Sequence, residues 1–299
     1  MPFNSRILGF ALAFCGVVFF SAKAVIVKLA FQYEIDYLSL LALRMIIALP
    51  FYLVIAFWTQ KNGSAIQISK KDLLWLFFFA FIGYYLASLF DFWGLEFIKA
   101  SLERLVLFAY PTIVILLSYF ILKTKISKKQ IVSILITYLG LIIAFYEDVD
   151  WNSSGLLIGA LLVFLSAICY AGYLVGSGWL IPKFGAIKFT SYAMIVSCVS
   201  VLGHFILVGR DLSTLLAYPN EVYLLSIVMA VFSTILPSFL VSYAIKVIGA
   251  PNFSIVGSVG PVSTIILAYF ILNEDIYLMQ GIGTVIVILG VLYATKLKK

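Results

Sequence analysis

Five ionisable side chains lie inside long apolar stretches of the 299-residue sequence. They are Lys23, Arg44, Asp91, Glu103 and Arg104. A charged side chain at the centre of a membrane-spanning helix costs about 2.5–3.5 kcal/mol on insertion scales, so residues of this kind commonly bind charged molecules, relay protons or pair with one another. We therefore take these five residues as candidates for binding a small charged molecule.

Two interpretations of these charges are open. In the first, the five side chains share a depth in the outer half of a membrane and bind solute. In the second, Lys23–Asp91 or Arg44–Glu103 pairs are structural, or side chains near a helix end extend to the membrane surface.

Two other side chains could contribute chemistry. Trp93, together with Tyr84 and Tyr85, could line a cavity or serve only in packing. His204 could carry a proton, because imidazole titrates near neutral pH, or it could be a hydrogen-bonded structural residue. The three cysteines form no CxxC pair and have no histidine at ligand spacing. We therefore expect no disulfide and no metal site. We also expect no cofactor and no catalytic residue.

The elements that carry these residues are predicted to be transmembrane helices. Hydrophobic residues make up 64% of the chain and charged residues 11%, and the mean hydropathy is +1.14. A soluble domain is about half apolar and a quarter charged, so this chain has too little polar surface to face water. About 20 apolar residues span a bilayer as a helix. The predicted spans are 6–30, 37–58, 72–95, 101–122, 128–147, 154–176, 187–208, 221–245, 252–273 and 276–295. The fold class is thus an all-α integral membrane protein with ten transmembrane helices.

Basic residues between the spans predict the orientation of the chain. Fourteen Lys and Arg residues fall in one alternating set of connections and ends, whereas four fall in the other set. Cytoplasmic loops carry the excess of Lys and Arg, so both termini are expected to be cytoplasmic. The same rule explains the net charge of +7, and we expect no nucleic-acid partner.

An internal repeat appears when the chain is shifted by 150 residues. Residues 91–145 match residues 241–295 at 16 of 55 positions, including Pro111 with Pro261. The predicted repeats are 1–148 and 151–299, with five spans each. Because five is odd, the second repeat must enter the membrane from the opposite side, which is a common design of transporters.

The two repeats differ at the charged positions. The residues 150 places after the five charges are Tyr173, Met194, Val241, Phe253 and Ser254. This asymmetry predicts a cavity with charged groups on one side and an apolar wall on the other, which suits a zwitterionic or anionic metabolite with an apolar part.

The two matched prolines, Pro111 and Pro261, lie near the middle of their predicted spans. Proline removes a backbone donor and clashes with the preceding turn, so each helix is expected to bend there. The freed carbonyl groups could face the cavity, or the bends could serve only the shape of the helices.

The segments Pro111–Leu122 and Pro261–Glu274 resemble the fourth-helix motif of EamA-type members of the drug/metabolite transporter superfamily. The first segment departs from the motif because Thr124 stands where Glu274 stands in the second. The resemblance extends over essentially the whole chain. It implies a ten-helix carrier built from inverted repeats that exports amino acids or other small metabolites.

The sequence is thus predicted to encode a secondary transporter of small metabolites that works by alternating access and is not an enzyme. The alternative is an intramembrane enzyme that acts on a lipid or prenyl substrate, although DxxxD, HExxH and GxSxG patterns are absent. The plan suits a multi-pass protein of a bacterial inner membrane. The expected partners are a small-molecule substrate and the lipid bilayer, and a homodimer is possible.

Overall fold

The computed structural model describes residues 3–62, 69–146, 155–272 and 276–295, and this part of the chain is helical without strands. The first half contains α1 (Phe3–Phe31), α2 (Tyr37–Asn62), α3 (Lys70–Ala80), the π-helical segment η1 (Phe81–Leu86), α4 (Ala87–Phe97), α5 (Ala100–Leu107), α6 (Tyr110–Leu122) and α7 (Lys128–Phe145). The second half contains α8 (Leu156–Phe184), α9 (Ala186–Leu207), the 3-10 segment η2 (Leu212–Leu216), α10 (Asn220–Ala230), the π-helical segment η3 (Val231–Ile235), α11 (Leu236–Ile248), α12 (Ala250–Val256), α13 (Val259–Leu272) and α14 (Leu278–Thr295).

Eight helical segments of the described chain are long and apolar enough to cross a membrane. They are Arg6–Phe31, Tyr37–Thr59, Lys70–Phe97, Leu102–Leu122, Leu156–Phe184, Ala186–Leu207, Asn220–Ile248 and Ala250–Leu272. Each coincides with one of the ten predicted spans. The other two predicted spans, 128–147 and 276–295, correspond to α7 and to the shorter apolar helix α14. Residues 148–150, between the predicted spans 128–147 and 154–176, and the motif residue Glu274 lie outside the described residues.

Sequence signals fix where several helices begin and end. The start of α7 is a capping box, in which Ser127 accepts a hydrogen bond from the Gln130 backbone at 3.2 Å and the Gln130 side chain accepts one from the Ser127 backbone at 2.9 Å. Gly185 alone separates α8 from α9, and Gly249 separates α11 from α12. Their φ angles of +78° and +80° are accessible to glycine without steric cost.

Two irregular features recur 150 residues apart. The helix of the third predicted span contains η1 at Phe81–Leu86, and that of the eighth contains η3 at Val231–Ile235. Single π-helical turns inside α-helices are rare and often accompany functional sites. The helix is also interrupted between α5 and α6 and between α12 and α13, immediately before Pro111 and Pro261.

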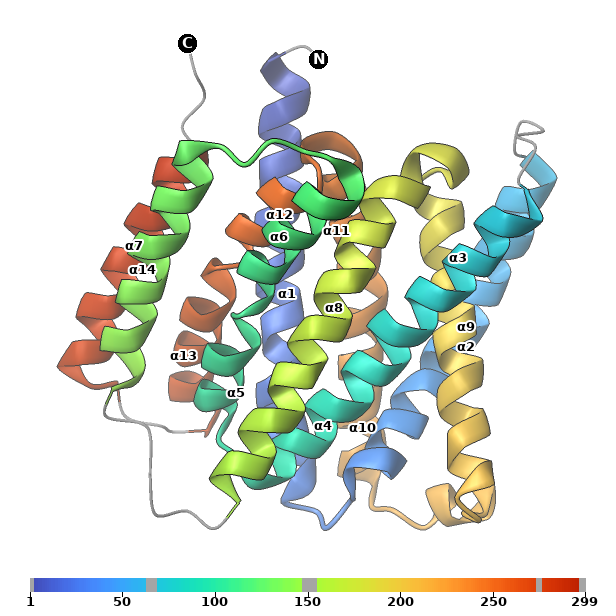
Figure 1. Ribbon diagram of the computed structural model, residues 1–299. Coiled ribbons are helices and arrows are strands. Elements are labelled where there is room, and N and C mark those ends of the chain that lie inside the picture. The colour runs from blue at the N-terminus through green and yellow to red at the C-terminus, as the bar shows by residue number, and fades with distance from the viewer. Residues whose placement is uncertain (1–2, 63–68, 147–154, 273–275, 296–299) are drawn as a thin grey trace.

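The helices α7 and α14 pack together at one edge of the molecule (Figure 1). Their contact depends on glycine, because a Cβ atom on Gly283 would lie 2.3 Å from the Gly140 carbonyl oxygen. Ser133 donates a hydrogen bond to the Gly290 carbonyl at 2.7 Å. Position 283 lies 150 residues after 133, and position 290 lies 150 residues after 140. The two contacts therefore join equivalent positions of the two halves. Small residues of this kind let helix backbones approach closely in a membrane.

The remaining helices enclose one large core in which α1 and α8 lie centrally (Figure 1). Figure 1 also places the start of α1 and the end of α14 at the same face of the molecule. The fold therefore positions the middle of α1 against elements of both halves, including α4, α11 and α13.

Candidate functional site

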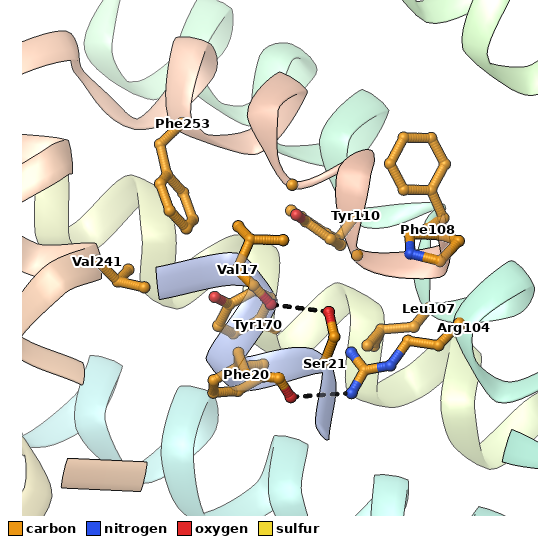
Figure 2. A pocket seen from close by; sticks show the side chains of 13 residues that line it. Val17, Phe20, Ser21, Arg104, Leu107, Phe108, Tyr110, Tyr170, Val241 and Phe253 are labelled. Atoms are coloured by element: carbon orange, nitrogen blue, oxygen red, sulfur yellow. Dashed lines mark hydrogen bonds between the residues drawn. The ribbon is translucent and has the colours of Figure 1, made fainter. Parts of the chain in front are cut away.

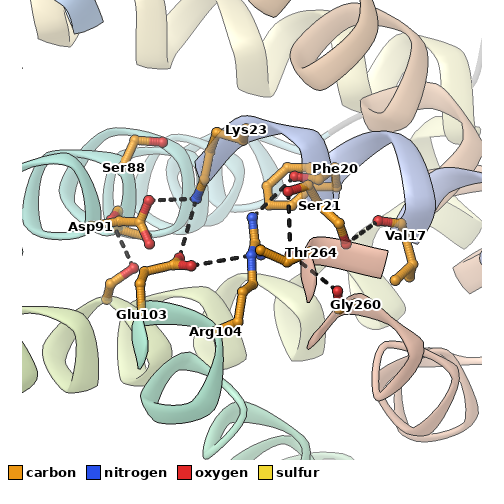
Figure 3. A network of polar contacts seen from close by, with 12 residues as sticks. Val17, Phe20, Ser21, Lys23, Ser88, Asp91, Glu103, Arg104, Gly260 and Thr264 are labelled. Atoms are coloured by element: carbon orange, nitrogen blue, oxygen red, sulfur yellow. Dashed lines mark hydrogen bonds and ion pairs between the residues drawn. The ribbon is translucent and has the colours of Figure 1, made fainter. Parts of the chain in front are cut away.

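Four buried charged side chains form a connected group, which we call the charge cluster: Lys23, Asp91, Glu103 and Arg104 (Figure 3). Lys23 pairs with Asp91 at its Oδ2 atom and lies 3.8 Å from Oε1 of Glu103. The Nε atom of Arg104 lies 3.1 Å from Oε2 of Glu103. Each of these side chains is at most 6% exposed. The cluster therefore joins α1, α4 and α5 inside the protein.

A sharp reversal of the chain brings the two carboxylates together. Asp91 lies in the last two turns of α4, which ends at Phe97, and Glu103 lies in the first turn of α5. Between them the backbone is extended at Ile98 and Lys99. Glu103 then joins the new helix by donating its backbone N–H to the Lys99 carbonyl at 3.0 Å. Asp91 and Glu103 face Lys23 on α1 from two different helices.

The charge cluster balances its own charge, since it contains two cations and two carboxylates. Burying charge is costly, and a buried ion pair offsets that cost only where partners are close. The Asp91 Oδ1 atom and both Glu103 carboxylate oxygens nonetheless accept no hydrogen bond within the described structure. Arg104 also donates to the Phe20 carbonyl at 3.1 Å, which ties α5 to α1 (Figure 3).

Arg44 lies apart from the charge cluster. It is 3% exposed on α2, donates to the Ser88 hydroxyl at 3.1 Å and places its guanidinium carbon 4.7 Å from the centre of the Phe92 ring. No carboxylate of the described residues lies within 4.0 Å of it, and its Nε has no hydrogen-bond partner there. The Arg44–Glu103 pair considered from the sequence is therefore wrong, because Glu103 pairs with Arg104 and Lys23 instead.

A small cavity lies between the two halves at the helix interruptions (Figure 2). Its volume is about 30 Å³, and the Arg104 side chain forms the charged side of the cavity. Val241 and Phe253 of the second half contribute an apolar side opposite Arg104 (Figure 2). Pro261 also lines this cavity, whereas Pro111 is buried at the second position of α6.

A second cavity of about 20 Å³ lies beside it. Its lining includes Lys23 of the charge cluster and Ser88, the hydrogen-bond partner of Arg44. Phe20 and Tyr170 line both cavities. One cavity therefore touches the charge cluster through Arg104, and the other touches it through Lys23.

Aromatic side chains form the wall of this region. Tyr173, the counterpart of Lys23 in the second half, contacts Tyr84 edge to face with ring centres 4.5 Å apart. Tyr170 contacts Tyr110 in the same way at 5.2 Å. A Cβ atom on Gly257 would lie 1.5 Å from the Tyr110 hydroxyl, so only glycine fits there.

The other candidates lie elsewhere. Trp93 is 37% exposed, stacks on Tyr37 at 5.6 Å and lines neither of these two cavities. His204 is partly buried and packs against Tyr85 with ring centres 5.8 Å apart. The second-half counterparts Met194 and Ser254 are buried but line neither of these two cavities.

Sequence reasoning missed Tyr110, Tyr170, Ser88 and Gly257. The available signal for Tyr170 was its position one helical turn before Tyr173, on the same face. With 26 Phe and 18 Tyr in the chain, that signal is weak. Gly257 follows from no local pattern, because its constraint comes from a tyrosine of the other half.

Two ion pairs link the halves away from the cavities. Asp36, before α2, accepts a hydrogen bond from Arg210 at 2.6 Å. Burial raises the pKa of the Asp36 carboxyl, but hydrogen bonds from Ser39 and Arg210 lower it further, so its pKa lies below the ordinary value. Asp72 of α3 pairs with Lys183 of α8 at 2.5 Å.

These features define a helical membrane protein with a buried, charged and aromatic region between its halves. A model of the EamA-like transporter family matches residues 7–146 and 157–295. The chain belongs to this family and is a multi-pass membrane transporter, as the sequence resemblance predicted.

Relatives and a solved structure agree with this assignment. The chain is 31% identical over 275 residues to "Uncharacterized transporter YcbK" of Bacillus subtilis (strain 168), covering 90% of this chain and 86% of that protein. It is 27% identical over 294 residues to "Uncharacterized transporter YyaM" of the same organism, covering 97% and 92%. One crystal structure superposes with a TM-score of 0.78 over 99% of both chains at 14% identity, which shows a shared fold.

Proposed function

We propose that this protein is a secondary transporter that moves small metabolites, such as amino acids, across a bacterial inner membrane by alternating access. The proposal includes ten spans, arranged as the repeats 1–148 and 151–299 with inverted topology, and cytoplasmic termini. Net export is the proposed direction, and this part rests on the family resemblance.

Contacts that recur at a separation of 150 residues support the inverted repeats. A Cβ on Gly9 would lie 2.8 Å from a methyl group of Ile248, and one on Gly159 would lie 2.7 Å from a methyl group of Ile98. Gly159 lies 150 residues after Gly9, and Ile248 lies 150 residues after Ile98, so the two contacts are equivalent. A pseudo-twofold relation between the halves explains this exchange of partners, as it does for the α7–α14 contact.

The small size of the cavities supports alternating access and carries the proposal. On this measure of volume a water molecule needs about 10–15 Å³, so the cavity of about 30 Å³ holds only two or three waters and the cavity of about 20 Å³ only one or two. Sites for small molecules usually measure about 300–1,000 Å³. The charged region between the halves must therefore open before a metabolite can enter, which is the movement that a carrier makes.

The proposed solute region lies between Arg44 and the charge cluster on one side and Val241 and Phe253 on the other. Neither Arg44 nor Trp93 lines a cavity, but Arg44 adjoins the smaller one through Ser88. Trp93 is 37% exposed and stacks on Tyr37, so it is the weakest member of the proposed site. Pro111 and Pro261 lie in the first turns of α6 and α13, next to the interruptions, and are proposed as the points of bending.

Flux into sealed vesicles tests the proposal. Purified protein is reconstituted with an internal pool of amino acids and organic acids, and exchange against a labelled external pool is followed by mass spectrometry. We expect exchange of at least one solute, unchanged in chemical structure, that vesicles without protein do not show. Absence of exchange for every solute would contradict transport, and formation of a new lipid or prenyl product would favour the enzyme alternative.

A further inference from the structure

Arg44 differs from the other buried charges in having no acidic partner among the described residues. The guanidinium group offers five N–H donors, of which the structure uses one, toward Ser88. Its Nε is buried without a hydrogen-bond partner. An ionised side chain taken out of water without compensation is strongly unfavourable, so a protein retains such a group where something else supplies the missing anion.

The charge balance of the region leaves one positive charge for that anion. Lys23 and Arg104 are matched within the charge cluster by Asp91 and Glu103. Among the described residues, Arg44 is the remaining buried cation of this layer. A single carboxylate neutralises it, whereas a phosphate dianion would leave excess negative charge in a buried region.

The surroundings of Arg44 suit a solute with an apolar part. Ser88 lines the cavity of about 20 Å³ next to Lys23, and Tyr84 and Tyr170 line the same cavity. Phe92 supports the guanidinium plane from one side. A fork of parallel N–H donors binds a carboxylate through two hydrogen bonds, which a lysine ammonium cannot reproduce.

We propose that Arg44 binds the carboxylate of a monoanionic or zwitterionic solute, and that the charge cluster positions α1, α4 and α5 without binding the solute anion directly. This inference rests on the proposed function, because it names the class of molecule that the carrier moves.

Binding in detergent tests the inference separately from flux. The probes are acetate, benzoate, phenylacetate and L-phenylalanine, each compared with its own amide, together with chloride and inorganic phosphate. Thermal unfolding gives an apparent dissociation constant for each probe. We expect at least one carboxylate to raise Tm saturably while its amide does not, and we expect chloride and phosphate to have no comparable effect.

Substitutions at Arg44 complete the test. Arg44→Lys is expected to weaken carboxylate binding about tenfold or more through loss of charge-assisted hydrogen bonds, and Arg44→Met to abolish it. Lys188→Gln removes a partly buried cation from α9 and serves as the control, with binding unchanged. The inference is overturned if no carboxylate exceeds its amide, if chloride or phosphate binds equally well, or if Arg44→Met binds like the unaltered protein.

The Tm measured without solute distinguishes a solute-binding role of Arg44 from a structural role. Because no ion pair is lost, Arg44→Met is expected to unfold at the same Tm as the unaltered protein or above it. Lys23→Met leaves the buried Asp91 carboxylate without its ion-pair partner, so this variant is expected to unfold at a lower Tm. Equal destabilisation by the two substitutions, or failure of Arg44→Met to fold, would assign Arg44 to structure and overturn the inference. Carboxylate binding without vesicle flux would instead contradict only the transport proposal.

Discussion

The two halves of the molecule have the same backbone irregularities but opposite side-chain chemistry. The π-helical segments Phe81–Leu86 and Val231–Ile235 occur at equivalent places, as do the interruptions before Pro111 and Pro261. Between its two irregularities the first half buries Asp91, Glu103 and Arg104, whereas the second half buries Val241, Phe253 and Ser254 at the equivalent positions. The backbone irregularities are therefore shared by the two halves, while the buried charged side chains of the described residues are concentrated in the first half.

The largest effect is expected when the charge cluster of the first half is broken. Among the described residues, Lys23→Met leaves the buried Asp91 without an ion-pair partner and leaves Glu103 paired only with Arg104. Removing one partner of a buried ion pair commonly costs about 3–5 kcal/mol. We expect a loss of stability of this order in thermal or denaturant unfolding of the purified protein.

A double substitution is the control for this first prediction. Lys23→Met combined with Asp91→Leu removes both the cation and its closest carboxylate, so stability is expected to recover by more than half. A double variant as unstable as Lys23→Met would contradict the assignment of Lys23 and Asp91 as a pair.

An intermediate effect is expected where the halves meet through glycine. Gly283→Ala places a methyl group 2.3 Å from the Gly140 carbonyl oxygen, so α7 and α14 must separate. Overpacking of this kind costs about 1–3 kcal/mol. Gly281→Ala, two residues earlier on α14, is the matched control because a Cβ there has nothing within 4 Å. Equal unfolding temperatures for the two variants would show that the close contact does not contribute to stability.

The smallest effect is expected at the ion pair of Asp36 and Arg210. The pKa of Asp36 is lower in the folded state than its ordinary value. Its contribution to stability is therefore complete above the unfolded pKa of about 3.9 and is lost as the pH falls through the folded value. Both side chains are about one-third exposed, so the effect is expected to be at most about 1 kcal/mol.

Asp36→Asn measures this contribution directly. We expect the difference in Tm between Asp36→Asn and the unaltered protein to be constant from pH 5 to 7 and to shrink below about pH 4. A difference that grows on acidification would have the wrong sign for a carboxyl with a lowered pKa.

Sequence reasoning located the residues of the site better than their partners. Lys23, Asp91 and Arg104 were visible because charge is rare within apolar runs. The Lys23–Asp91 pair considered from the sequence is present in the structure. The pairing of Glu103 with Lys23 and Arg104 depends on the chain reversal at Ile98 and Lys99, whose direction no periodicity specifies. The Arg44–Glu103 alternative failed for this reason, since proximity in depth does not determine which helices are neighbours.

The extent of the helices was predictable from the apolar runs of the sequence. Long apolar runs must be helical in lipid because backbone groups must be hydrogen-bonded internally, and eight predicted spans coincide with apolar helices of the structure. The π-helical turns and the small cavities were not predictable. Close contacts between the halves occur there, such as Gly83 against Tyr173, and they have no local sequence signature.

Side-specific labelling tests the central claim, that two inverted repeats face each other across the membrane. Single cysteines replace Asp36, Asp72, Lys183 and Arg210 in a chain without its three native cysteines, and an impermeant maleimide is added to intact cells. The account predicts labelling from outside at 36 and 210, and at 72 and 183 only after the cells are opened. Labelling of 36 and 183 from the same side would contradict it.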